Sequence, residues 1–362
     1  MLRVCHLSPA YFARESVLGG GERFAEELAR AMARRARVKF VSFGRRAGRE
    51  SMAGGEAPYE RVILRSWTRD PATPFSPRLF AELRGADVIH CHQYYVLPTV
   101  LACLQGHLQG SRVFVSDLGG GGWTPGYQID QSRWIAAHLP ISLYAARSLP
   151  GRNRSRHVIY GGVDLERYPM RPAPAHDGSL VFLGRLLPHK GVHFLIEGLP
   201  DGVPLHLLGT APDPDYLERL RRLAGAKPVE FHLGLADDEV LGYLQRAAAL
   251  VHPTPVSADG SAGVHELFGL ALVEAMACGC PVVASAAASL PEIVTDGVTG
   301  YLVEPNSPAA LGAAVRRLLA DLPTWRRLSD AARQRVVADF TWDRVVDRCF
   351  AAYSESPRTE AA

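Results

Sequence analysis

Two acidic residues stand out because seven mostly apolar residues separate them, in Glu266-Leu-Phe-Gly-Leu-Ala-Leu-Val-Glu274. The pattern predicts a helix from about Gly269 to Cys278, with Glu266 in the loop before it and Glu274 inside it. A carboxylate among Leu, Val, Ala and Met is costly unless a partner accepts its charge or its hydrogen bonds. Sugar hydroxyls would be suitable donors. A helix-end Glu followed by a core-edge Glu paired with Arg would give the same pattern.

A basic loop, Gly184-Arg185-Leu-Leu-Pro-His-Lys190-Gly191, follows a predicted buried strand and precedes a helix. Arg185 and Lys190 could neutralise a diphosphate leaving group, whose negative charge grows as a glycosidic bond breaks. A solvated basic loop is the alternative interpretation. The glycines at 19–21 hold the corresponding place near the N-terminus, where backbone N–H groups and a helix start can bind phosphate. A glycine triplet can equally be a plain tight turn.

The elements that would position these residues alternate between short apolar strands and amphipathic helices. Strands buried on both faces imply parallel sheets covered by helices, and the series starts at Leu2 and again at Leu180. We therefore predict an α/β fold of two doubly wound, Rossmann-like domains facing a central cleft. Ligands should bind beyond the carboxyl ends of the strands. The expected domains are residues 1–165 with about 340–362, and residues 166–339.

Composition narrows the class of protein. The 362 residues are 47% hydrophobic and 21% charged, as in globular proteins, and the apolar runs are too short to cross a bilayer. Six scattered cysteines and the absence of a signal peptide pattern favour the cytoplasm. Residues 1–165 carry 22 Lys and Arg against 13 Asp and Glu (+9), and residues 166–362 carry 18 against 24 (−6). The basic half suggests contact with an anionic membrane, lipid or glycan, or only solvated arginines; nucleic acid is not expected.

Taken together, these motifs resemble glycosyltransferase family four, the retaining family with the GT-B fold, over nearly the whole chain. The resemblance also rests on four further segments: Val158-Ile-Tyr-Gly-Gly-Val-Asp164, Leu208-Gly-Thr-Ala-Pro212, the run from Leu290-Pro-Glu to Tyr-Leu-Val303, and Phe340-Thr-Trp342. It implies transfer of a sugar from a nucleoside-diphosphate sugar, such as a UDP-sugar or GDP-sugar, to a glycan, a lipid-linked acceptor or a small molecule. It implies neither a cofactor nor a metal.

The resemblance also implies site residues. Arg185, Lys190 and Glu266 would be catalytic. The donor would be bound by Gly20 and Gly21 at the diphosphate, Glu266 at the sugar hydroxyls, Phe268, Gly269 and Leu270 at the helix start, Glu274 at the ribose and Leu235 near the base. Loss of Lys190 or Glu266 is expected to lower turnover by about a hundredfold, with little change in melting temperature.

The chain departs from the family pattern in three places. Many members have a histidine after the fifth strand of the first domain, where this chain has Asp117. The loop 253–265 is long enough to act as a lid, and residues 286–290 lack the glycine that often precedes Pro-Glu-Ile. Asp117, His92 and Tyr94 are the acceptor-side candidates. His90-Cys-His92 would place both imidazoles on one side of a strand, but without a third ligand in view no metal site is expected.

Three other functions stay open at this point. A phosphorylase-like enzyme that uses pyridoxal phosphate would need an internal lysine, and the chain has only Lys39, Lys190 and Lys227. An inverting GT-B enzyme would need a general base, for which Asp117 or His92 could serve. A catalytically silent protein would bind a nucleotide sugar without transferring it.

Overall fold

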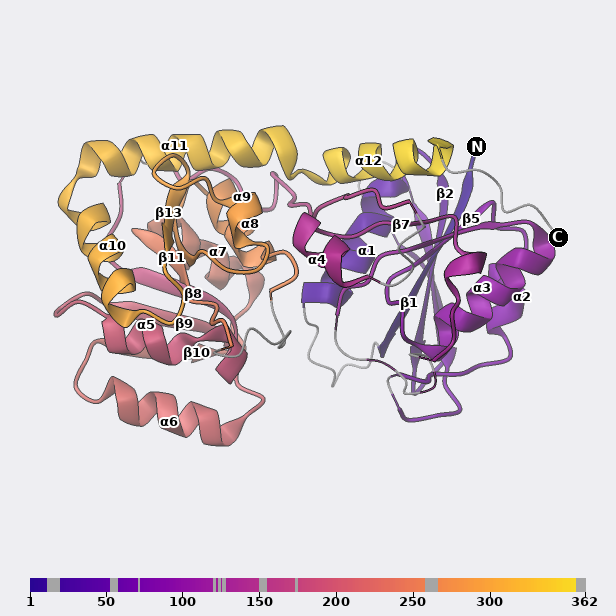
Figure 1. Cartoon of the computed structure of the whole chain (residues 1–362), viewed down its shortest axis with the longest axis horizontal. Coiled ribbons are helices and arrows are strands. Elements are labelled where there is room, and N and C mark those ends of the chain that lie inside the picture. Colours follow the sequence, from indigo (N-terminus) through magenta and orange to yellow (C-terminus); the bar gives the residue numbers. More distant parts are fainter. Residues whose placement is uncertain are drawn as a thin grey trace. The chain divides into compact units, whose positions relative to one another are not determined.

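The computed structural model of the chain describes residues 1–11, 20–52, 58–70, 72–119, 122, 125, 128–149, 155–172, 175–257 and 266–355. These residues form two compact units (Figure 1). Unit 1 is Met1–Gly162 together with the C-terminal segment that begins at Trp342, and unit 2 is Val163–Thr341. Among the described residues, none of the helices combines the length and apolar character needed to cross a membrane.

Unit 1 is built on a seven-stranded sheet with the order β3-β4-β2-β1-β5-β6-β7. Its strands are β1 (Arg3–Tyr11), β2 (Arg37–Gly44), β3 (Gly48–Met52), β4 (Tyr59–Arg65), β5 (Val88–Cys91), β6 (Arg112–Val115) and β7 (Ala137–His138). Its helices are α1 (Gly20–Met32), α2 (Leu79–Leu83), α3 (Leu97–Gln109), η2 (Ser132–Trp134), α4 (Leu143–Ser148) and α12 (Trp342–Glu355). All neighbouring strands pair in parallel except β3 and β4, which are antiparallel.

Unit 2 is built on a six-stranded parallel sheet with the order β10-β9-β8-β11-β12-β13. Its strands are β8 (Leu180–Arg185), β9 (Leu205–Thr210), β10 (Val229–Leu233), β11 (Ala249–His252), β12 (Val282–Ser285) and β13 (Gly300–Val303). Its helices are η3 (Pro188–Lys190), α5 (Val192–Gly198), α6 (Pro214–Ala224), α7 (Asp237–Arg246), α8 (Leu270–Ala277), α9 (Leu290–Ile293), α10 (Pro308–Ala320) and α11 (Leu322–Asp339).

The core of unit 2 shows why these segments fold as they do. Strand β11 is buried along its whole length, and its first three residues, Ala-Leu-Val, are apolar as a strand covered on both faces requires. Polar side chains cap the starts of α6, α10 and α11: at α6, Asp213 accepts a 3.0 Å hydrogen bond from the amide of Tyr216. Trp325 of α11 is fully buried, and its indole N–H donates to the carbonyl of Ala248 at 2.7 Å. The apolar pattern thus builds the sheet, and local caps place the helices over it.

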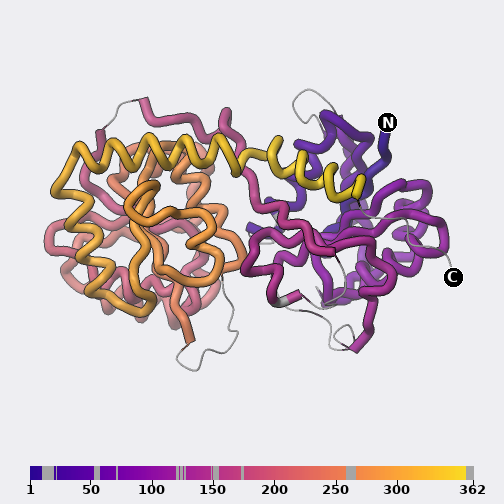
Figure 2. Tube along the Cα trace, turned by 45° about the horizontal axis from the view of Figure 1, so that its top comes forward, coloured from indigo at the N-terminus to yellow at the C-terminus, as the bar shows by residue number. Residues whose placement is uncertain are grey.

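The C-terminal helix α12 belongs to unit 1 and packs beside α1, as the yellow and indigo segments in Figures 1 and 2 show. Arg34 pairs with Asp343 at 3.0 Å and Arg35 with Asp347 at 2.5 Å. A Cβ at Gly162 would lie 2.7 Å from the indole of Trp342, so a glycine is needed where the helix starts. The last helix therefore completes the hydrophobic and charged surface of α1.

Two details differ from the sequence prediction. The glycines at 19–21 were expected before the start of the first helix, but α1 begins at Gly20, so Gly20 and Gly21 form its first turn. The antiparallel edge strand β3 was not predicted. Its residues Gly-Arg-Glu-Ser-Met are largely exposed, and without an apolar face they give no strand signal in the sequence.

Candidate active site

The candidate donor site lies where the strand order of the second sheet reverses. From β8 the chain adds β9 and β10 on one side, and then returns to place β11 on the other side of β8. Arg185 is the last residue of β8 and His252 is the last residue of β11. In open parallel sheets this reversal opens a crevice beyond the carboxyl ends of the two strands, where ligands bind.

Lys190 reaches this crevice from the short helix η3. Gly191 follows with φ 69°, and a Cβ there would lie 1.9 Å from the carbonyl oxygen of Pro253. Only glycine fits both the left-handed backbone and this close approach. Gly191 thereby allows the Lys190 loop to pack directly against the segment that follows β11.

Glu266 is the acidic centre of the site. One oxygen, Oε2, lies 2.5 Å from Nζ of Lys190 and 3.0 Å from Nε2 of His252. The side chains of Lys190 and Glu266 are each 16% exposed, and that of His252 is 3% exposed. Burial alone would raise the pKa of Glu266, but Lys190 and His252 outweigh it and hold that pKa well below its usual range. Glu266 is therefore an anion at neutral pH.

The segment after Glu266 is fixed by Ser289. Its hydroxyl lies 2.8 Å from the carbonyl oxygen of Glu266 and 2.9 Å from that of Phe268, so it can donate to either. Gly269 precedes α8 with φ 109°, and Leu270 is the first residue of the helix. The N-terminus of α8 consequently starts next to Glu266, where its N–H groups and its dipole favour an anion.

The other donor-binding candidates lie on separate elements of unit 2. Glu274 is in the middle of α8 and is 7% exposed, although its helix neighbours are apolar. Leu235 is half-buried between β10 and α7, after Gly234 with φ 76°. Arg185 is exposed, and within the described part of the chain its guanidinium has no ion pair or hydrogen bond. Contacts in the structure thus join Lys190 with Glu266, while the roles of these three stay predictions.

In unit 1, the glycine turn and Asp117 lie close together. A Cβ on Gly21 would be 3.4 Å from Cβ of Leu118, the neighbour of Asp117. Asp117 accepts a hydrogen bond of 3.3 Å from the amide of Gly119, and burial raises the pKa of its carboxyl. Gly19 and residues 258–265 of the predicted lid lie outside the described residues.

The other two acceptor-side candidates are buried. Tyr94 is 1% exposed and packs in the core against Tyr95 and His138. His92 is 2% exposed. Neither side chain offers a surface to an acceptor as the structure stands, so Asp117, which is partly exposed, is the accessible candidate of the three.

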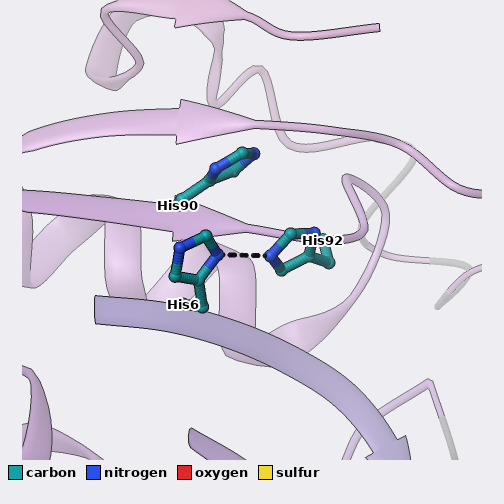
Figure 3. A group of neighbouring side chains, drawn as sticks. All are labelled: His6, His90 and His92. Carbon is teal, nitrogen blue, oxygen red and sulfur yellow. Dashed lines mark hydrogen bonds between the residues drawn. The ribbon is translucent and has the colours of Figure 1, made fainter. Parts of the chain in front are cut away.

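His92 belongs to a cluster that we call the histidine trio, formed with His6 of β1 and His90 of β5 (Figure 3). His6 Nδ1 lies 2.9 Å from His92 Nε2, while the two nitrogens of His90 contact the Tyr353 hydroxyl at 2.8 Å and the Ser116 hydroxyl at 2.9 Å. Burial lowers the pKa of all three imidazoles, that of His6 to about 3. The trio is therefore a neutral, hydrogen-bonded part of the core.

Sequence reasoning missed His6, His252 and Ser289. His6 pairs in register with His90 across two strands that are 84 residues apart in the chain, a relation that no local pattern contains. His252 did carry a signal, because a polar residue that ends a fully apolar strand marks the ligand-binding edge of a parallel sheet.

Comparison with known protein families agrees with this architecture. Residues 18–167 match the model described as Glycosyltransferase Family 4, and residues 171–335 match the model described as Glycosyl transferases group 1. Two Rossmann-like units, one matched by each of these family models, define a glycosyltransferase of GT-B fold. The chain belongs to glycosyltransferase family 4.

Similar proteins support this membership. Glycogen synthase of Mycobacterium tuberculosis is 30% identical over 299 residues, which cover 76% of this chain and 70% of that protein. Alpha-maltose-1-phosphate synthase of the same organism is 30% identical over 314 residues, covering 74% and 79%. The crystal structure of Anabaena HepE in complex with UDP and glucose superposes with a TM-score of 0.73 at 20% identity, covering 98% of this chain and 100% of that one.

Some cations of the basic first half are paired in the structure: Arg3 with Asp87 at 2.7 Å, and Lys39 with Glu82 at 2.9 Å. These pairs leave the balance of +9 unchanged, because that balance already counts both partners. Contact with an anionic membrane stays a prediction.

Proposed function

We propose that the chain is a retaining glycosyltransferase that moves a sugar from a nucleoside diphosphate to a glycan, lipid-linked or small-molecule acceptor, without a catalytic metal. The observation that carries this proposal is the contact of Lys190 and Glu266 at the reversal of the second sheet, beside the start of α8. A cation, an anion and a helix N-terminus at one strand edge suit a ligand that joins a diphosphate to a sugar.

Each group has a defined task in this proposal. Arg185 and Lys190 offset the charge that develops on the leaving diphosphate, and the N–H groups of Phe268, Gly269 and Leu270 assist them. Glu266 accepts hydrogen bonds from sugar hydroxyls through the oxygen that Lys190 and His252 leave free. Glu274 holds the ribose, and Leu235 contacts the base.

The departing diphosphate would take the proton of the acceptor hydroxyl on the same face of the sugar. The new glycosidic bond then forms on the face from which the old one leaves, and the anomeric configuration is retained. No enzymic nucleophile or general base is required for this step. Asp117, whose pKa is raised by burial, would orient the acceptor or contact the donor sugar.

The donor is expected to be a nucleoside-diphosphate sugar. HepE was crystallised with UDP and with UDP-glucose, and a 34% identical relative from M. tuberculosis is described as a GDP-mannose-dependent mannosyltransferase. These two donors share the diphosphate and differ in base and sugar. The diphosphate common to them is the group that Arg185 and Lys190 would bind.

The test begins with a panel of UDP-, GDP- and ADP-sugars, using thermal shift for binding and mass spectrometry for transfer. With the active donor, the anomeric configuration of the product is read by NMR, and Glu266→Gln is compared with Glu304→Gln, an exposed acid of the same unit. We expect retention and a roughly hundredfold loss in Glu266→Gln alone. Inversion of the anomeric configuration would instead indicate an inverting enzyme with a general base such as Asp117. Donor binding with neither transfer nor hydrolysis would indicate a silent binding protein.

A further inference from the structure

A second histidine cluster lies on the edge of the second sheet, apart from the residues assigned above. His206 is on β9, and Glu230 and His232 are on the edge strand β10. Glu230 pairs in register with His206, and alternate residues of a strand share a face, so the three side chains lie on one face of the sheet. We call these three residues the edge-strand triad.

The ligand atoms of the edge-strand triad converge. His206 Nδ1 lies 3.2 Å from His232 Nε2 and 3.4 Å from Oε2 of Glu230, and His232 Nε2 lies 3.2 Å from the same oxygen. A tetrahedral zinc ion with bonds of about 2.0–2.2 Å holds its ligand atoms about 3.3–3.6 Å apart. The three atoms therefore already form one nearly equilateral face of such a coordination shell.

We propose that the edge-strand triad binds a divalent transition-metal ion of the zinc type, with water in the remaining position. Two imidazoles and one carboxylate suit Zn²⁺, whereas Mg²⁺ and Ca²⁺ prefer oxygen ligands alone. An ion can enter from solvent, because Glu230 is 64% exposed and the two histidines are 15% and 20% exposed.

The surroundings support the imidazoles as ligands. The hydroxyl of Tyr243, on α7, lies 3.5 Å from Nδ1 of His232, and its ring is 4.8 Å from that of His206 and 4.9 Å from that of His232. With Nε2 on the metal, His232 can donate its Nδ1–H to this hydroxyl, the outer contact that metal-bound histidines usually make.

The histidine trio of unit 1 lacks the ligand geometry of the edge-strand triad. His6 and His92 are almost parallel, at 14°, and His90 is stacked on His92 with ring centroids 4.6 Å apart (Figure 3). Imidazole lone pairs lie in the ring plane, so stacked rings cannot all point at one ion. Both nitrogens of His90 are also occupied by hydroxyl groups. Of the two clusters, the edge-strand triad is the one fit to hold a metal.

A bound ion would join β10 to β9 through side chains in addition to their backbone hydrogen bonds. Strand β10 is the edge of the sheet and leads through Gly234 to Leu235. The expected role is structural, because none of the three ligands is a residue that the proposed transfer uses. Chelation should therefore leave the transfer reaction intact while it lowers stability.

The experiment uses the full chain, stripped with a chelator and titrated with Co²⁺ or Zn²⁺ alone. We expect one equivalent of Co²⁺ with the intense visible absorption of a four-coordinate ion, its displacement by Zn²⁺, and a higher melting temperature with either metal. Glu230→Gln and His232→Gln should each weaken binding by more than the roughly 10–100-fold typical of an outer-shell loss. Tyr243→Phe should weaken metal binding by about tenfold.

His193→Gln is the matched control, since it alters a half-buried histidine of the same unit outside the edge-strand triad. Glu230 is exposed, so Glu230→Gln should keep the fold, which circular dichroism checks. The proposal is overturned by unchanged Co²⁺ binding in Glu230→Gln and His232→Gln. It is equally overturned by a weak six-coordinate spectrum, or by binding of several ions that His193→Gln reduces as much.

Discussion

The ion pair of Lys190 and Glu266 should stabilise unit 2, and this can be measured separately from activity. An ammonium and a carboxylate in contact have charge centres about 4 Å apart, which corresponds to about 4 kcal/mol at an effective dielectric constant of 20. Removing one partner of a buried pair typically costs about 3–5 kcal/mol. Because both side chains keep 16% exposure, we expect about 3 kcal/mol for either Lys190→Met or Glu266→Gln.

The double variant isolates the interaction between the two residues. Lys190→Met with Glu266→Gln leaves no unpaired charge, so its loss should be smaller than the sum of the single losses by about 2 kcal/mol. Amide hydrogen exchange of the buried strand β11 reports the unfolding free energy of unit 2 in each variant. A coupling energy below about 0.5 kcal/mol would mean that the pair does not form in solution. The expected loss also replaces the sequence-based expectation of an unchanged melting temperature.

The same pair predicts a split between binding and turnover. Oε2 of Glu266 lies 2.5 Å from Nζ of Lys190, and its negative charge would repel a diphosphate. Glu266→Gln should therefore bind a bare nucleoside diphosphate at least as tightly as the wild type, measured by calorimetry, while Lys190→Met binds it more weakly. Both should lose about a hundredfold in transfer. Equal weakening of diphosphate binding in the two variants would refute the idea that the carboxylate competes for the lysine.

Three further predictions concern neighbouring features. His252→Gln can still donate to Glu266 and should keep most of the turnover, whereas His252→Leu should lose about tenfold in kcat; equal rates would remove His252 from the site. Ala288 has φ 51°, a conformation that costs a residue with a side chain about 1–2 kcal/mol, so Ala288→Gly should raise the unfolding free energy of unit 2 by about 0.5–1 kcal/mol. The lowered pKa values of the histidine trio mean that the unfolded chain binds more protons below pH ~6.5. The free energy of unfolding, measured with urea, should therefore fall as the pH is lowered from 7 to 5, by up to about 2 kcal/mol per histidine at pH 5. An unfolding free energy that stays constant over this pH range would contradict the prediction.

The fold could be predicted from the sequence, because the periodicity of apolar residues indicates the buried strands and the amphipathic helices. The pairing of Lys190 with Glu266 was also within reach, because each follows a strand end of one parallel sheet. Ala288 is a more detailed example. Residues 286–290 lack a glycine in the sequence, and in the structure Ala288 adopts the left-handed backbone conformation that favours glycine. Local chemistry of this kind can be predicted residue by residue.

Contacts set by strand register could not be predicted in the same way. The edge-strand triad exists because Glu230 lies opposite His206, and a shift of one residue would turn Glu230 and His232 to the other face of the sheet. The contact of His252 with Glu266 likewise depends on where the segment after β11 returns to the sheet edge. Register and loop return are properties of the assembled sheet, and no local segment contains them.

Histidines occupy equivalent strands at the reversals of the two sheets, but with opposite consequences. In unit 2, His252 ends β11 and points its Nε2 at an ionised carboxylate of the site. In unit 1, His90 of β5 is held by hydroxyl groups from α12 and from the end of β6, and its pKa lies well below the usual value. An imidazole that is buried, neutral and doubly hydrogen-bonded cannot exchange a proton with an acceptor. In the described loops beyond these strands, Asp117 carries a carboxyl group whose pKa is raised by burial.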